Sequence, residues 1–351
     1  MPWREIAGQD RAVRLLRSAL ERGQPHHAYL LAGPAGVGKE LLARLFAQAA
    51  NCEAEPELRP CGKCASCTAI ARGVHPDVTW VMPQSEAVSR GLLSRADLES
   101  APSRDIRVDE VRALSRRLAL AAVRGRRKIA LLVPADALNE RAQNTLLKTL
   151  EEPPPATTFL LVTDQPDLLL ATVRSRCTRV QIAPLPEQVV AELLIARGAP
   201  TDEARRRAAI ADGSIGRALA LDAKEVDRRR ELVEAIEAAI TAPDERGVLD
   251  LAETAGERDA AAHIASAVQA WTRDLLVAQA GGDTISMVSP ISPMASPISP
   301  ALAARASSVP PPALLSQATL CAEVIEALEQ NGNGRLQIER LLLGMRELRG
   351  G

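Results

Sequence analysis

Hydrophobic residues gather in short continuous runs through the first half of the chain, and segments with helical spacing separate these runs. The continuous runs lie at residues 28–32, 128–133 and 158–163, and runs of this kind are typical of strands that are buried on both faces. The segments 78–81 and 178–182 are mixed in polarity and also predict strands. Strands that alternate with helices predict a parallel sheet with helices on both sides. We therefore expect an α/β domain over residues 1–185.

The pattern changes after Pro184 and Pro186, because only helical spacing follows. We expect a small helical domain at 186–223 and a larger one at 224–351. Within the larger one, residues 281–312 are rich in glycine, serine and proline. That composition is typical of a loop or a disordered insert rather than of a domain boundary.

A glycine-rich segment joins the first apolar run to the first long helical pattern. Strand, glycine loop and helix in this order are typical of a phosphate-binding loop. Gly33, Gly36 and Gly38 would let backbone N–H groups surround phosphate oxygens, and Lys39 would reach the outer phosphates. Glu40, however, stands where such loops carry the hydroxyl that ligates Mg²⁺. The loop has the sequence of a nucleotide site, and whether it binds a nucleotide stays open.

Four of the six cysteines form a cluster, and they are Cys52, Cys61, Cys64 and Cys67. Four thiolates at this spacing can close a tetrahedral Zn²⁺ site with no position left for water, so the predicted role is structural. A disulfide or a redox pair is the weaker alternative, since the chain has the features of a cytoplasmic protein.

The bulk composition limits the function classes. The formal net charge is −1, which gives no global field toward nucleic acid or membrane. No apolar run reaches the ~18 residues that cross a bilayer, and the first ten residues lack the apolar core of a signal peptide. We expect a cytoplasmic protein without a membrane partner. Aromatic residues make up only 2%, so the core must be aliphatic.

One segment departs from this neutral balance. Arg104 to Lys128 contains nine basic residues and three acidic ones. Two interpretations stay open for it: a solvated helix face, or a surface that follows the phosphates of DNA.

Three motifs carry a specific resemblance. They are His-His-Ala-Tyr-Leu at 26–30, Leu-Leu-Lys-Thr-Leu-Glu-Glu-Pro-Pro at 146–154 and Ser-Arg-Cys at 175–177. In this order over residues 1–222 they resemble the AAA+ P-loop subunits of the bacterial DNA polymerase III clamp loader. The segment from Asn331 to Leu343 resembles the end of the collar domain of these proteins.

Two types of clamp-loader subunit are similar to this chain, the gamma/tau ATPase motor and the delta prime stator. Motors carry an Asp-Glu pair at the end of the strand beside the loop, where this chain has Val133 and Pro134. Together with Glu40, this departure makes the chain resemble the delta prime family, whose members typically do not hydrolyse ATP. The alternative is an active motor in which Asp136 or Glu40 supplies the missing ligand. An unrelated phosphate-binding regulator is a third, weaker reading.

The resemblance implies further expectations. The chain would help load the sliding clamp onto primed DNA, as a component of a DNA-directed DNA polymerase holoenzyme. Its partners would be the gamma/tau and delta subunits. Residues 186–223 would form a lid, residues 224–351 the oligomerisation collar, and residues 52–67 a zinc knuckle. ATP or ADP would bind weakly or not at all. Arg176 would act in trans as an arginine finger, the alternative being an ion pair within its own chain.

Overall fold

The chain divides into two compact units, Met1–Leu185 and Pro186–Gly351. The computed structural model describes residue 3 and residues 6–98, 100–221, 223–256, 258–280, 306–330 and 332–350. Most of the predicted insert, 281–305, therefore lies outside the described residues, as does Asn331. The further division into a lid and a collar at residue 223 stays a prediction.

The first unit is built on a parallel five-stranded sheet in the order β2-β3-β4-β1-β5. Its strands are β1 (Ala28–Ala32), β2 (Val78–Val81), β3 (Lys128–Leu132), β4 (Thr157–Thr163) and β5 (Thr178–Gln181). Leu30 of β1 pairs with Leu161 of β4 on one side and with Arg179 of β5 on the other. The predicted parallel α/β fold is confirmed, and each apolar run forms a strand.

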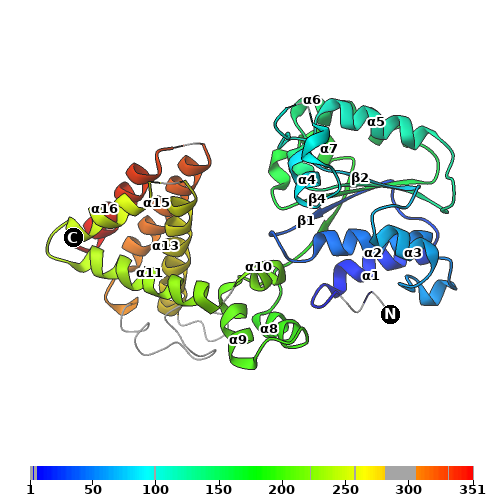
Figure 1. The fold of residues 1–351 in the computed structure, drawn as a ribbon. Coiled ribbons are helices and arrows are strands. Elements are labelled where there is room, and N and C mark those ends of the chain that lie inside the picture. Colours follow the sequence, from blue (N-terminus) through cyan, green and yellow to red (C-terminus); the bar gives the residue numbers. More distant parts are fainter. Residues whose placement is uncertain are drawn as a thin grey trace. The chain divides into compact units, whose positions relative to one another are not determined.

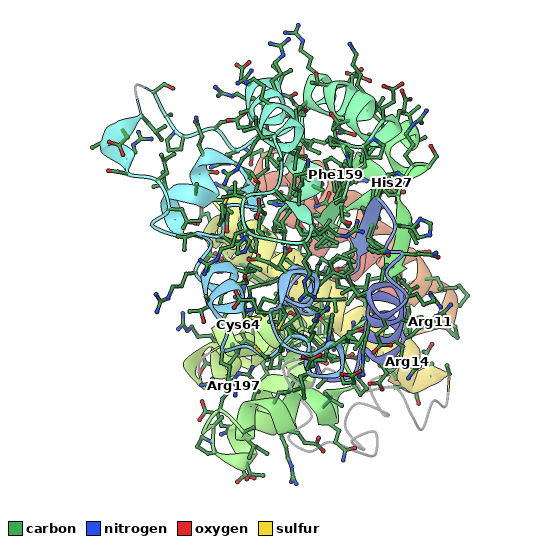
Figure 2. All side chains as sticks on the ribbon, turned by 90° about the vertical axis from the view of Figure 1, so that its right-hand side faces the viewer. Arg11, Arg14, His27, Cys64, Phe159 and Arg197 are labelled. Carbon is green, nitrogen blue, oxygen red and sulfur yellow. The ribbon has the colours of Figure 1, made fainter. Side chains whose placement is uncertain are left out.

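Helices cover both faces of this sheet (Figure 1). One face packs on α1 (Asp10–Glu21), α2 (Lys39–Asn51) and α3 (Ala65–Ala71). The opposite face packs on α5 (Val108–Ala119), α6 (Glu140–Glu151) and α7 (Ala171–Arg174). Neighbouring residues of β1 serve the two faces in turn: Tyr29 and Leu31 belong to the first core, and Leu30 to the second. Arg11 and Arg14 of α1 are exposed (Figure 2).

The first turn of α5 is closed by an acidic side chain. The N-cap is Arg107, whose backbone N–H donates to the carboxylate of Glu110 at 2.9 Å. Val111, Leu114 and Leu118 form the buried face of the helix. The segment between β2 and α5 contains one short helix, α4 (Gln84–Ser89), and a 3-10 turn at Arg95–Asp97.

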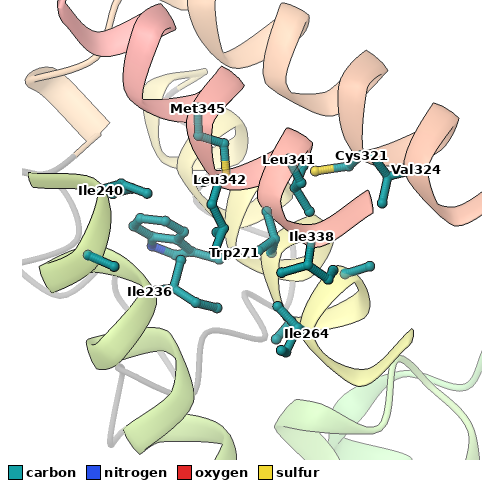
Figure 3. Packing of buried hydrophobic residues seen from close by; sticks show 14 of the residues in the cluster. Ile236, Ile240, Ile264, Trp271, Cys321, Val324, Ile338, Leu341, Leu342 and Met345 are labelled. Atoms are coloured by element: carbon teal, nitrogen blue, oxygen red, sulfur yellow. The ribbon is translucent and has the colours of Figure 1, made fainter. Parts of the chain in front are cut away.

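The second unit is helical throughout its described residues. Its helices are α8 (Glu187–Ile195), α9 (Thr201–Ile210), α10 (Ile215–Ala220), α11 (Ala223–Thr241), α12 (Arg246–Thr254), α13 (Arg258–Gln279), α15 (Pro311–Glu329) and α16 (Gly334–Gly350). Trp271 of α13 is fully buried in its core, among residues such as Ile236 of α11 and Leu342 of α16 (Figure 3). None of the helices in the described ranges is both long and apolar enough for a membrane span.

The end of the predicted insert belongs to this core. Ala306 and Val309 are buried, and their carbonyl oxygens both accept from the side-chain amide of Gln279. The helix α15 begins at Pro311, a position where proline's missing N–H costs nothing. Residues 306–312 are thus packed structure, in contrast to the predicted loop.

Candidate nucleotide loop and cysteine cluster

The glycine loop runs from the carboxyl end of β1 into the N-terminus of α2. Gly36 and Gly38 have φ angles of 73° and 97°, which favour glycine. Gly33 has no room for a side chain, because a Cβ there would lie 2.1 Å from the carbonyl oxygen of Ile182. Each of the three predicted glycines is therefore required by the backbone conformation or the packing of this loop.

Lys39 is bound within this loop. Its Nζ atom donates to the carbonyl oxygens of Gly33 at 2.7 Å and of Pro34 at 2.6 Å. Burial lowers the pKa of Lys39, and the carboxylates of Asp164 and Asp136 oppose that shift. The ammonium group already has oxygen partners from its own loop, so a phosphate would have to replace them.

The carboxylate of Glu40 already has a partner within the protein. Arg90, which follows α4, donates to both of its carboxylate oxygens, at 2.6 and 2.9 Å. Arg90 also donates to Glu86 at 2.7 Å, and its two acidic partners raise the pKa of the guanidinium. Two parallel hydrogen bonds of this kind fix the carboxylate in one orientation. Sequence reasoning missed Arg90, because it lies in a polar segment without hydrophobic periodicity.

The carboxyl end of β3, which β4 separates from β1 in the sheet, carries no carboxylate at its first two positions. Val133 is buried and Pro134 follows it. Asp136 lies in the 3-10 turn that follows, and its Oδ1 atom accepts a hydrogen bond from the hydroxyl of Thr163. Its carboxylate thus links β4 to the turn after β3. The substitute ligands considered for an active motor, Glu40 and Asp136, both have partners within the protein.

The four predicted cysteines come together in space. Their Sγ atoms all lie within 4.8 Å of one another, so the cluster could hold a metal ion. Cys52 ends α2, Cys61 and Cys64 flank a tight turn, and Cys67 lies in the first turn of α3. Backbone N–H groups of Cys61, Cys64 and Cys67 donate to the sulfur atoms of Cys52, Cys61 and Cys64 at 3.3–3.4 Å. All four are free thiols, so the disulfide alternative has no support.

Hydrogen bonds from the surroundings fix the cluster. Gln48 of α2 donates to the carbonyl oxygen of Cys67 at 2.8 Å, and Glu53 accepts from the hydroxyl of Ser66 at 2.9 Å. Burial alone would raise the pKa of Cys61, but hydrogen bonds from the backbone of Lys63 and Cys64 and with the side chains of Cys52 and Cys64 together lower that pKa to about 6. Such a thiol is ready to act as a thiolate ligand.

Arg176 lies just after α7 and is joined to its own chain. Its guanidinium contacts the carboxylate of Glu151 at 2.6 Å and donates to the carbonyl oxygen of Thr172 at 2.9 Å. The side chain is about one third exposed. The intrachain ion pair considered as the alternative role is therefore present, while a role in trans stays a prediction.

The basic segment Arg104–Lys128 has mixed roles. Lys128 is buried, and its Nζ atom donates to the carbonyl oxygens of Leu118 and Leu120. Arg117 donates to the carbonyl oxygen of Pro76 at 2.9 Å. The remaining exposed members, such as Arg116 and Arg126, leave both interpretations of this segment open.

Residues 8–186 match the model of a protein family described as DNA polymerase III, delta subunit. The match spans just over half of the chain and includes the glycine loop, the cysteine cluster and Arg176. The chain belongs to this family. The resemblance inferred from the three sequence motifs is confirmed at that level.

Individual relatives agree with this assignment. A Pseudomonas aeruginosa protein named DNA polymerase III subunit delta' is 40% identical over 183 residues, which are 52% of this chain and 51% of that protein. A Haemophilus influenzae protein named DNA polymerase III subunit tau/gamma is 34% identical over 223 residues, which are 62% of this chain and 30% of that protein. The chain thus spans about half the length, or less, of these curated relatives.

Two solved structures show a weak overall similarity to this chain. A Thermotoga maritima protein related to the gamma subunit of DNA polymerase III has 15% identity and a TM-score of 0.40, over 95% of this chain and 99% of that chain. The RuvB Holliday junction branch migration motor of Thermotoga maritima has 18% identity and a TM-score of 0.38, over 71% and 76% of the two chains.

Proposed function

We propose that this chain is the delta prime stator of a bacterial DNA polymerase III clamp loader. It would join gamma/tau and delta subunits in the cytoplasm and help place the sliding clamp on primed DNA. The family match over residues 8–186 supports this assignment, and so does the 40% identity to a subunit delta'.

The state of the loop supports a stator rather than a motor. Hydrolysis of ATP needs a Mg²⁺ ligand after the loop lysine and a carboxylate at a nearby strand end. Here the first position is Glu40, held by Arg90 in a two-bond ion pair, and the second is Val133-Pro134. Lys39 is bonded to its own loop. ATP or ADP would therefore bind weakly or not at all, and this chain would not hydrolyse it.

The cysteine cluster would hold a structural Zn²⁺. Four sulfur atoms within 4.8 Å of one another match the donors that a closed tetrahedral site needs. Cys52 and Cys67 are fully buried. A bound Zn²⁺ would tie α2, the turn at 61–64 and α3 together, and no step of the loading reaction would pass through it.

Arg176 would supply an arginine finger to a neighbouring motor subunit. A guanidinium stabilises the negative charge that spreads over the phosphoryl oxygens in the transition state. Arg176 is partly exposed, and its partner Glu151 is about half exposed, so the pair lies at the protein surface. An exposed ion pair contributes ~1 kcal/mol or less to stability. A phosphate bound by a neighbouring subunit could therefore replace Glu151 as the partner of Arg176.

The rival function is an active gamma/tau-type motor, favoured by the 34% identity to a tau/gamma subunit and by the preserved loop backbone. Reconstitution separates the two. Clamp loading should fail when this chain is omitted from a complex of gamma/tau and delta. It should recover with either the wild-type chain or the Lys39→Ala variant. Recovery with the wild type but not with Lys39→Ala would instead favour the motor.

A further inference from the structure

A cavity of about 260 Å³ lies in the first unit, away from the glycine loop. It is bounded by α1, by the end of α2, by the segment before the cysteine turn and by the segment before β3. Pro25 precedes β1 and Arg127 precedes β3, so the cavity lies near the amino ends of the strands. The glycine loop follows the carboxyl end of β1 and is at the opposite edge of the sheet.

The cavity has an excess of positive charge. Four arginines line it, and they are Arg17, Arg59, Arg126 and Arg127. Its single acidic lining residue, Glu21, already pairs with Arg17 at 2.6 Å. Within the described part of the chain, no carboxylate forms an ion pair with the other three. Burial lowers the pKa of Arg127, and the guanidinium of this residue donates to the hydroxyl of Thr158 at 3.3 Å rather than to a carboxylate.

Hydrogen bonds hold the backbone of the segment that carries Arg126 and Arg127. The carboxylate of Asp77 accepts the N–H groups of Val123, Arg124 and Gly125. The side chain of Asn51 both accepts from the N–H and donates to the carbonyl oxygen of Arg127, each at 3.0 Å. The bonds to Asp77 and Asn51 therefore fix the backbone of 123–127, while the side chain of Arg126 stays exposed. A site whose shape is fixed before binding avoids part of the entropy cost of ordering it.

The floor of the cavity is apolar. Leu20, Ala49, Ala50 and the buried Trp3 contribute to it, and the indole N–H of Trp3 is used in a bond to the carbonyl oxygen of Arg59 at 3.0 Å. An apolar floor with an arginine rim matches a ligand that carries an apolar side chain next to carboxylates, since the guanidinium fork binds carboxylates through two hydrogen bonds.

Single-stranded nucleic acid fits the cavity less well. Its bases bind to proteins largely by stacking on accessible aromatic rings. The chain has six aromatic residues, all described, and five of them are buried. The sixth, Trp80, is half-buried within β2 and does not line the cavity.

The geometry points to a docking site for an acidic peptide segment of a partner protein, with an apolar side chain in the cavity and its carboxylates on Arg59, Arg126 and Arg127. This site is independent of ATP and of the proposed arginine finger. Its partner would reach the chain from the side that carries α1 and the cysteine cluster, where Figure 2 shows Arg11, Arg14 and Cys64.

The test is fluorescence anisotropy of a fluorescein-labelled peptide, Gly-Ser-Asp-Asp-Asp-Leu-Phe, with the full-length chain. We expect a dissociation constant at or below about 100 µM. Arg126→Glu should weaken binding by about tenfold or more, since a hydrogen bond to a charged group is lost and a repulsion is added. Ala50→Leu should also weaken it, by filling the floor. Arg104→Glu is the matched control, because Arg104 is also exposed but precedes α5 and does not line the cavity.

Circular dichroism checks that each variant is folded. Arg126 makes no hydrogen bond through its side chain within the described residues, so its replacement should leave the fold intact. Three results would each overturn the inference: no binding of the acidic peptide, equal binding of a peptide with Asn in place of Asp, or equal binding by Arg126→Glu. Tighter binding of a twenty-residue oligothymidylate that Arg126→Glu abolishes would assign the cavity to nucleic acid instead.

Discussion

Arg90 and Glu40 are fifty positions apart in the chain, and they form a two-bond ion pair at 2.6 and 2.9 Å beside the glycine loop. The residue that departs from the usual loop sequence is therefore part of a defined local structure. It connects the first turn of α2 to the end of α4.

The first prediction concerns ATP turnover. The purified chain should release phosphate from ATP no faster than the assay background. Glu40→Thr should not raise the rate, because Val133 and Pro134 still leave the strand end without a carboxylate. A steady-state phosphate-release assay measures both proteins. Turnover that Lys39→Ala abolishes would show a working site.

The second prediction concerns the metal. Protein purified without chelator should contain one zinc per chain, bound by four sulfur atoms. Cys64→Ser should lower the zinc content and loosen the segment 52–67, while the sheet stays folded. Elemental analysis and hydrogen exchange report these two effects. Cys177→Ser is the control, since Cys177 lies outside the cluster. A wild-type protein without zinc would contradict the prediction.

The third prediction concerns Asp77 and acid stability. Burial would raise the pKa of Asp77, but N–H groups of Val123, Gly125 and Arg124 outweigh it and lower the pKa. The charged form therefore stabilises the fold above the ordinary carboxyl pKa of roughly 4, and this contribution is lost as pH falls through the lowered value.

Asp77→Asn should consequently reduce the free energy of unfolding at pH 7 by about 1–3 kcal/mol, since N–H groups would lose their charged acceptor. The difference in the free energy of unfolding between wild type and variant should become smaller below about pH 4. Urea unfolding at pH 7 and at pH 3 measures this difference. Asp109→Asn changes an 84% exposed carboxylate and should have little effect at either pH.

The fourth prediction concerns Arg176 in the reconstituted complex. Arg176→Ala should leave assembly intact and reduce hydrolysis only at the adjacent motor site, by roughly 10³–10⁵ at that site. Arg176→Lys should restore little, because an ammonium lacks the planar fork. Glu151→Gln is the control: it removes the intrachain ion pair but keeps the guanidinium. Unchanged turnover with Arg176→Ala would exclude the finger.

The fifth prediction concerns the second unit. A chain that ends at Leu185 should fold and retain zinc, because the first unit has its own cores on both faces of the sheet. It should not join gamma/tau and delta subunits if the helices of 224–351 make the ring contacts. Size-exclusion chromatography of the mixed subunits tests this, with the full-length chain as the control. Full incorporation of the shortened chain would contradict the collar assignment.

The sequence predicted the sheet well for a physical reason. The strands β1, β3 and β4 are short, mostly apolar runs that are buried along their whole length. The edge strands β2 and β5 are mixed in polarity and only partly buried. The cysteine cluster was equally predictable, because its spacing is local. The short helix α3 was missed, since small residues between Cys64 and Ala71 give no apolar periodicity.

Contacts between distant polar residues could not be predicted. The bonds of Arg90 to Glu40, of Asp77 to residues 123–125, and of Lys39 to its own loop depend on the folded backbone. The same is true of residues 306–312, whose composition suggests a loop although Ala306 and Val309 are buried.

Gly33 shows that the packing of the protein alone can require a residue of the phosphate-binding loop motif. Its lack of a side chain is required by the carbonyl oxygen of Ile182, and the positive φ angles of Gly36 and Gly38 are required by the turn into α2. All three glycines are required by the protein's own packing and backbone conformation, and this requirement holds even when no nucleotide binds. A pattern search for phosphate-binding loops will therefore find this sequence whether or not phosphate binds.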